Sequence, residues 1–184
     1  MSKVVVLLAE GFEEIEALTP VDLMRRAGID VVTASITEEL QVMGSHGIPV
    51  TADTVISKLG ETADALFLPG GKLGTDNLKA SAETAALIKD YLDKGRYLTA
   101  ICAAPTVFGK MGLLKGRKAT CYPGLEGQLT GAEWTGEEVS VAVDGNFVTS
   151  RGAGTAMDFS LKLIELLVSA EAADDIASKV VYKK

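Results

Sequence analysis

The chain has 184 residues, of which 47% are hydrophobic and 23% charged, and its formal net charge is −7. This size and composition are typical of one globular domain, here predicted over residues 1–184. The acidic balance argues against nucleic acid or an anionic membrane surface as a partner, because both call for basic patches. No run approaches the roughly 18 apolar residues of a membrane span, so we expect no membrane partner.

The predicted elements begin with a buried strand. Residues 4–9 are apolar and rich in valine, which is typical of a strand covered on both faces, and the run is too short for a signal peptide. Residues 11–28 place apolar side chains at helical spacing, with Gly28 as a stop signal. The remaining predicted elements are a strand at 29–36, a hairpin or edge segment at 40–50, a strand and glycine loop at 63–71, a helix at 81–95, a strand at 96–102, a helix at 104–114, a short strand end at 118–124, a hairpin at 137–152, a long helix at 154–170 and a short helix or tail at 172–184.

This alternation of strands and helices predicts an α/β fold, with a mostly parallel sheet covered by helices on both faces. Ligands bind such sheets beyond the carboxyl ends of the strands. Three loops are expected there, at residues 11–16, 69–74 and 102–105, and we predict the functional site where they meet.

Cys102 lies where a predicted strand turns into a helix, with Pro105 suited to the first helical turn. A side chain at such a turn is lifted off the sheet, as in a nucleophile elbow, and a helix N-terminus favours the thiolate by lowering the thiol pKa. An N–H from residue 103 and one from the Pro69–Gly71 loop would form an oxyanion hole. The alternative is a small cysteine buried in the core.

Glu16 is the acid predicted to act with this thiol. It belongs to the sequence "EEIE" at a helix start, where Glu13 and Glu14 are expected to face solvent. Glu16 differs because it adjoins the apolar Ile15, and because Pro20 cannot bond its carbonyl. A carboxyl held near a thiolate would have a raised pKa and could donate a proton. The alternative is a third solvated acid.

Residues that would bind a metal or a cofactor are scarce. The two cysteines form no CxxC pair and the single histidine cannot complete a zinc set. "RGAGTAM" lacks the third glycine of a dinucleotide loop, "GGKLGTDN" is not a Walker loop, and Arg151 is interpreted as structural. We therefore expect no metal and no cofactor. The sequence does not decide whether Cys102 and Cys121 form a disulfide. Free thiols in a reduced, cytoplasmic setting are favoured.

Four motifs carry a resemblance that covers nearly the whole chain in order: "EEIEALTPVDLMRRAGI", "LFLPGGKLG", "AICAAP" and "VTSRGAGTAMDF". Together they resemble the ThiJ/PfpI superfamily, and specifically its branch containing the parkinsonism-associated protein deglycase and its bacterial relatives. The resemblance implies a flavodoxin-like three-layer α/β sandwich and a homodimer.

The resemblance also implies roles for individual residues. Cys102 matches the reactive cysteine, and Glu16 matches the glutamate hydrogen-bonded to its sulfur. Gly71 and Ala103 match the oxyanion-type backbone donors. It further implies an arginine that approaches the site, at Arg26, and a residue near the dimer interface, at His46.

One position departs from the family pattern. Many relatives carry a histidine beside the cysteine, whereas "TCYPG" places Tyr122 there, and a tyrosine of pKa ~10 is a poor general base at neutral pH. A Cys-His-acid triad, and with it a peptidase, is therefore disfavoured. Cys121 is predicted to be a second, less reactive thiol in the wall of the site, and His46 to be either a site residue or a surface or interface residue.

Two functions remain open from the sequence. The resemblance implies a cofactor-free glyoxalase or deglycase acting on methylglyoxal, glyoxal or their adducts, in which Cys102 attacks the aldehyde and Glu16 moves the proton. The alternative is a non-enzymatic redox sensor or stress chaperone, in which the same thiol is oxidised to a sulfinate. Turnover of methylglyoxal would distinguish the two.

Overall fold

The structure is a computed structural model and describes residues 1–183. Its centre is a seven-stranded sheet in the order β10-β11-β7-β6-β1-β2-β5, parallel except for the edge strand β10, which runs antiparallel to β11. The strands are β1 Lys3–Leu8, β2 Asp30–Ser35, β5 Thr54–Val55, β6 Ala65–Leu68, β7 Tyr97–Ile101, β10 Val141–Asp144 and β11 Phe147–Ser150.

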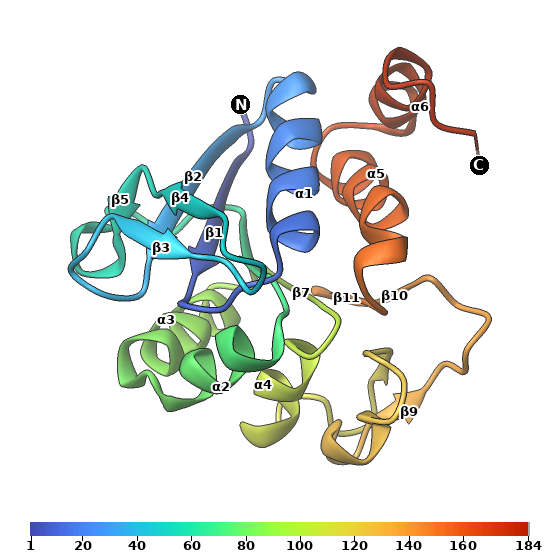
Figure 1. Ribbon diagram of the computed structural model, residues 1–184. Coiled ribbons are helices and arrows are strands. Elements are labelled where there is room, and N and C mark those ends of the chain that lie inside the picture. The colour runs from blue at the N-terminus through green and yellow to red at the C-terminus, as the bar shows by residue number, and fades with distance from the viewer. Residues whose placement is uncertain (184) are drawn as a thin grey trace.

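Helices cover both faces of this sheet (Figure 1). The helices on one face are α1 Glu14–Arg26, α5 Ala156–Leu167 and α6 Ala170–Lys179, and those on the other are α2 Lys72–Ala80, α3 Ala82–Asp93 and α4 Pro105–Lys110. The predicted flavodoxin-like three-layer sandwich is confirmed.

Strand β1 shows how the sheet is buried on both sides. Val4, Val6 and Leu8 belong to the core under α1, α5 and α6, whereas Val5 and Leu7 belong to the core under α2, α3 and α4. Successive side chains of a strand point to opposite faces, so a continuous apolar run is what a doubly covered strand requires.

Two small sheets lie outside this core. The predicted 40–50 hairpin is confirmed as the antiparallel pair β3 Gln41–Met43 and β4 Pro49–Thr51. A parallel pair joins β8 Lys118–Ala119 to β9 Glu133–Trp134. Short 3₁₀ helices occur at η1 Ile56–Lys58, η2 Glu126–Gln128 and η3 Ala153–Thr155.

Some predicted boundaries were wrong. Helix α2 was not predicted, because Gly74 interrupts its pattern and few apolar residues mark it. The predicted helix at 104–114 ends at Lys110, ahead of Gly112 at φ +72°. The predicted helix at 154–170 ends at Leu167, and Ser169 caps α6 by accepting a hydrogen bond from the Ala172 N–H. Across residues 1–183, no helix combines the length and the apolar character needed to cross a membrane.

Candidate functional site

The three predicted loops meet at the carboxyl ends of β1, β6 and β7, which are neighbours in the sheet. The Glu13 N–H donates to the Gly70 carbonyl at 3.0 Å, and the Gly74 N–H donates to the Gly11 carbonyl at 3.1 Å. These bonds tie the loop after β1 to the loop after β6. The expected meeting point of the loops is therefore where the structure places it.

Cys102 occupies a strained turn directly after β7. Its φ is +65°, and Val181 is the only other non-glycine among residues 1–183 with a positive φ. The Cys102 N–H donates to the Ser150 carbonyl at 2.9 Å, and its own carbonyl accepts the Tyr122 N–H at 2.7 Å. A conformation of this kind costs about 1–3 kcal/mol and persists only when neighbouring segments hold it. The turn has the strained geometry expected of an elbow, and strand β11 and the segment containing Tyr122 hold it in place.

Glu16 lies beside this thiol on the first turns of α1 and is only 1% exposed. Its carboxyl hydrogen-bonds to the Cys102 thiol, and it accepts the Gly70 N–H at 3.1 Å and a further backbone N–H from Ala153. Burial raises the pKa of Glu16 from 4.5 to about 7, against the lowering effect of these bonds. The carboxyl can therefore hold or release a proton near neutral pH.

The glycine loop allows these groups to approach one another closely. A Cβ on Gly70 would lie 2.4 Å from Glu16 Oε2 and 2.6 Å from the Cys102 Cβ. Gly71 has φ +92°, and a Cβ there would lie 2.3 Å from the Gly11 carbonyl oxygen. Only glycine fits at either position without moving the site.

The Cys102 thiol is less acidic than its place at a helix start predicted. Burial, the charge of an ionised Glu16 and the hydrogen bond to that carboxylate raise the pKa of Cys102 to about 12, while the N–H groups of Gly71 and Ala103 lower it in part. Helix α4 has only six residues, so its dipole offsets little of this.

The prediction of an acidic thiol is therefore wrong when Glu16 is ionised. When Glu16 holds the proton instead, its charge is gone and its O–H can donate to the sulfur. Thiol and carboxyl thus titrate as one unit, and the thiolate belongs with a protonated Glu16.

Tyr122 and Cys121, which are adjacent in the sequence, differ in their exposure. Tyr122 is half exposed, and its ring lies 3.5 Å from where a Cβ on Gly152 would stand, beside the Glu16 carboxyl. Cys121 is 1% exposed and belongs to the core, and burial raises its pKa to about 12. Both cysteines are free thiols. Cys121 packs in the core rather than in a wall of the site.

Two residues implied by the resemblance are not brought to the thiol within this chain. Arg26 is ten residues after Glu16, about 15 Å along α1, and its Nε donates to Asp22 Oδ2 at 2.7 Å. His46 lies in the turn between β3 and β4, largely exposed, with its Nδ1 3.0 Å from Glu14 Oε2. The expectation that Arg26 approaches the site is not met in this chain, and the interface role of His46 remains a prediction.

Glu14 was expected to face solvent and is instead buried, at 5% exposure. Its carboxylate accepts the His46 N–H at 2.8 Å, the Ile48 N–H at 3.4 Å and the Ser45 hydroxyl at 3.1 Å. Burial by itself raises the pKa of Glu14, but the bonds from His46, Ser45 and the backbone outweigh it and lower the pKa to about 2. Glu14 is therefore an anionic anchor for the β3–β4 turn.

With Glu13 and His46, Glu14 also forms a cluster whose ligand-type atoms lie within 4.8 Å of one another. The hydrogen bonds already engage the Glu14 carboxylate. The cluster is accounted for without a metal ion.

This arrangement defines an α/β protein with a cysteine on a strained elbow, backed by a buried carboxyl and two backbone donors. The DJ-1/PfpI family model matches residues 2–166. The chain belongs to the DJ-1/PfpI family, which confirms the resemblance to the ThiJ/PfpI superfamily.

Relatives from a plant, an animal and an archaeon share much of the sequence. Protein DJ-1 homolog B of Arabidopsis thaliana is 40% identical over 183 residues, 98% of this chain and 42% of the relative. The Parkinson disease protein 7 homolog of Danio rerio is 35% identical over 98% of this chain and 97% of its own length. Deglycase PH1704 of Pyrococcus horikoshii is 32% identical over 90% and 99%. The chain thus spans less than half the length of its Arabidopsis relatives and nearly all of the other two.

Solved structures of the family share the fold over the whole chain. A DJ-1 superfamily protein from Salmonella typhimurium has a TM-score of 0.95 at 35% identity, and oxidized DJ-1 of Toxoplasma gondii has one of 0.93 at 39% identity. In both cases all of this chain and all of the other chain are covered.

Proposed function

We propose that the protein is a cysteine-dependent, cofactor-free glyoxalase or deglycase that acts on methylglyoxal, glyoxal or their adducts, in defence against carbonyl and oxidative stress. The observation that carries this is the Glu16 carboxyl, buried, hydrogen-bonded to the Cys102 thiol and with a pKa of about 7. A relative named as a deglycase, 32% identical, supports the same reaction class.

The reaction on methylglyoxal needs one nucleophile and one proton carrier. The Cys102 sulfur attacks the aldehyde carbon, a C–S bond forms, and the carbonyl oxygen takes up the electron pair and a proton from Glu16. The resulting Glu16 carboxylate removes the hydrogen on that carbon and returns it to the neighbouring carbon. The hydroxyl proton of the first carbon passes to the former ketone oxygen, so the first carbon becomes the carbonyl of a thioester and the second carries the alcohol. Water then hydrolyses the thioester and releases lactate and the thiol.

No external oxidant or reductant is consumed in this sequence. One substrate carbon is oxidised from aldehyde to acid while its neighbour is reduced from ketone to alcohol. The N–H groups of Gly71 and Ala103 point at the sulfur, where they would stabilise negative charge on the adjoining oxygen.

The test is lactate formation from methylglyoxal by purified, metal-free protein. Cys102→Ser should lose the activity, and Cys121→Ala should keep it, because Cys121 is buried in the core. Equal activity in Cys102→Ser, or none in the parent protein, would overturn the proposal.

A redox function is the second candidate, favoured by the different exposure of the two thiols. Cys102 is partly exposed and hydrogen-bonded to donors that would hold a sulfinate, whereas Cys121 is buried. Two equivalents of peroxide would add two oxygen atoms to the sulfur. Mass spectrometry after mild peroxide treatment should locate both oxygens on Cys102. If the parent turns over no dicarbonyl and this product forms, the redox function takes precedence.

A homodimer belongs to the same proposal. Ile15 on α1 is 54% exposed and Ile48 in the β3–β4 turn is 52% exposed, and this turn packs against the start of α1 through Glu14. We propose that these two exposed side chains belong to the dimer interface. Light scattering at micromolar concentration should give a dimer that Ile15→Glu dissociates, and a monomeric parent would contradict it. A cytoplasmic location is proposed as well, because a reduced compartment preserves free thiols.

A further inference from the structure

A cleft of about 330 Å³ opens beside the candidate site and is lined by Ala103, the residue that follows Cys102. Helix α2 forms one wall, with Thr75 and Lys79 on the same helical face at positions i and i+4. Tyr122 and Gln128 belong to the opposite wall. Ala103, whose N–H points at the sulfur, therefore borders both the reacting thiol and this cleft.

The Thr75 hydroxyl is the first sign of a ligand. Thr75 is 2% exposed, and its Oγ1 has no hydrogen-bond partner among the described residues. The Thr106 hydroxyl, also in the cleft wall, is satisfied by the Ala103 carbonyl at 2.6 Å. Buried hydroxyls are rarely left without a partner. Rotation of the Thr75 side chain about its Cα–Cβ bond would turn this O–H toward a polar group bound in the cleft.

The charges around the cleft indicate which polar group this is. Lys72 and Lys79 line it, and Asp76 is the one acid among its lining residues, 3.8 Å from Lys72 in an exposed pair. The Lys79 Nζ donates to the neutral Gln128 Oε1 at 3.1 Å. Lys79 therefore carries a charge that no carboxylate of the described residues meets within 4 Å.

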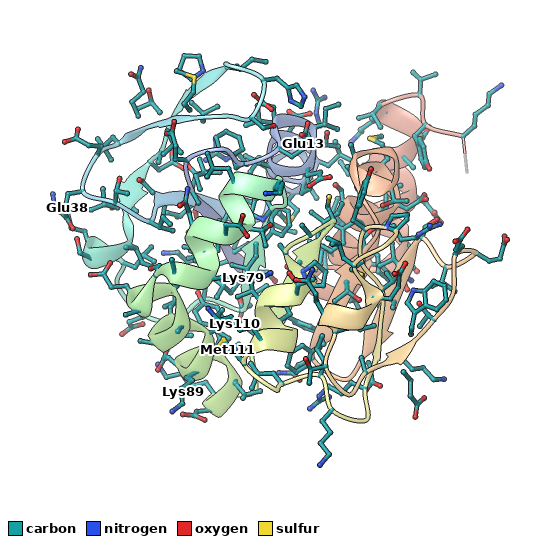
Figure 2. All side chains as sticks on the ribbon, turned by 60° about the horizontal axis from the view of Figure 1, so that its bottom comes forward. Glu13, Glu38, Lys79, Lys89, Lys110 and Met111 are labelled. Atoms are coloured by element: carbon teal, nitrogen blue, oxygen red, sulfur yellow. The ribbon has the colours of Figure 1, made fainter. Side chains whose placement is uncertain are left out.

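A second lysine reinforces this positive field. Figure 2 shows Lys79 and Lys110 side by side on neighbouring helices, and the Lys110 Nζ donates to the Lys79 carbonyl at 3.0 Å. Burial lowers the pKa of Lys79, and Lys110 adds to the lowering although Asp76 opposes it. A bound anion would relieve both effects. In a chain of net charge −7, this is a local reversal of sign next to the thiol.

The substrates considered are adducts of a dicarbonyl with a small thiol or amine. We propose that this cleft binds a carboxylate on the thiol or amine part of such an adduct, so that adducts with a carboxylate are preferred over neutral ones. The Lys79 ammonium and the Thr75 hydroxyl are the donors. The inference rests on the proposed function and adds no covalent step to it.

Binding can be measured apart from catalysis with two unreactive probes, N-acetyl-S-methylcysteine and its primary amide, which differ in charge. Amide chemical shifts of α2 should report binding of the acid about tenfold tighter than the amide. Lys79→Gln and Thr75→Val should each weaken binding of the acid about three- to tenfold without changing that of the amide. Lys89→Gln, an exposed lysine on α3 outside the cleft (Figure 2), is the matched control and should change neither. Equal binding of acid and amide by the parent would overturn the proposal.

Turnover then tests the substrate preference. The hemithioacetal of methylglyoxal with N-acetylcysteine should have a higher kcat/KM than that with N-acetylcysteine amide, and Lys79→Gln should remove the difference through KM with kcat retained. If the acid probe binds at α2 and no adduct is turned over, the proposed function fails and the carboxylate site stands. If both adducts are turned over equally and the acid probe does not bind, the carboxylate site fails and the function stands.

Discussion

Glu14 and Glu16 are two buried carboxyls on the same turn of α1, and their pKa values move in opposite directions, to about 2 and to about 7. Glu14 faces the β3–β4 turn, where Ser45, His46 and Ile48 supply donors that favour its charge. Glu16 faces the Cys102 thiol and meets fewer donors than its burial requires. The same side chain is thus an anion at one position and a carboxyl that can hold or release a proton near neutral pH two residues later, because its surroundings differ.

The largest effect is expected from Glu16→Gln. Glutamine can still hydrogen-bond to the sulfur but cannot pass a proton, so dicarbonyl turnover should fall by ~10²–10⁴-fold, the usual range for general acid-base catalysis. Lactate formation measures it, and circular dichroism should show the fold retained. Glu13→Gln is the control and should change little. Full turnover in Glu16→Gln would mean that Glu16 only fills space beside the thiol.

A smaller effect concerns the pH dependence of turnover. The reactive form, a thiolate beside a protonated Glu16, holds one proton between the two groups, so kcat/KM should rise as pH rises through about 7, where the pair loses its first proton. A profile of kcat/KM between pH 5 and pH 9 tests this. The inflection should be absent from the residual activity of Glu16→Gln, and its persistence there would assign it to another group.

Glu14→Gln should affect stability rather than chemistry. Neutralising Glu14 weakens the charge-assisted hydrogen bonds from Ser45, His46 and Ile48, at a cost on the order of 1–3 kcal/mol in the free energy of unfolding. Urea unfolding measures the loss, and turnover at saturating substrate should stay near the parent value. A variant as stable as the parent would show that the turn does not depend on this anion.

The smallest effect is the pH dependence of stability. The pKa of Glu14 is lowered on folding, so its contribution is present above about 4.5 and is lost as pH falls toward 2. The pKa of Glu16 is raised, so its contribution is present below about 4.5 and is lost as pH rises through about 7. The free energy of unfolding of the parent should therefore decline relative to Glu16→Gln between about pH 4.5 and pH 7. Relative to Glu14→Gln, the free energy of unfolding of the parent should instead decline as pH falls from about 4.5 toward 2.

The elements that the sequence predicted well are those with a local physical signal. The valine-rich run at β1, the capping serine before α3 and the stop at Gly28 each involve neighbouring residues only. The junction at Cys102 was recognisable for the same reason, since an apolar strand runs directly into a helix start with Pro105. Helix α2 was missed because its local signal is weak and its packing is tertiary.

The chain by itself thus determined the alternation of strands and helices, the place of the thiol between a strand and a helix, and the presence of a carboxyl at the start of α1. Only the tertiary structure decided the burial and pKa of that carboxyl, that Glu14 is an anchor, that Arg26 lies far along α1 and that Thr75 and Lys79 share a cleft with Ala103. The burial of a side chain and the charges around it depend on segments that are distant in the sequence. A pKa, and with it a chemical role, cannot be read from neighbouring residues alone.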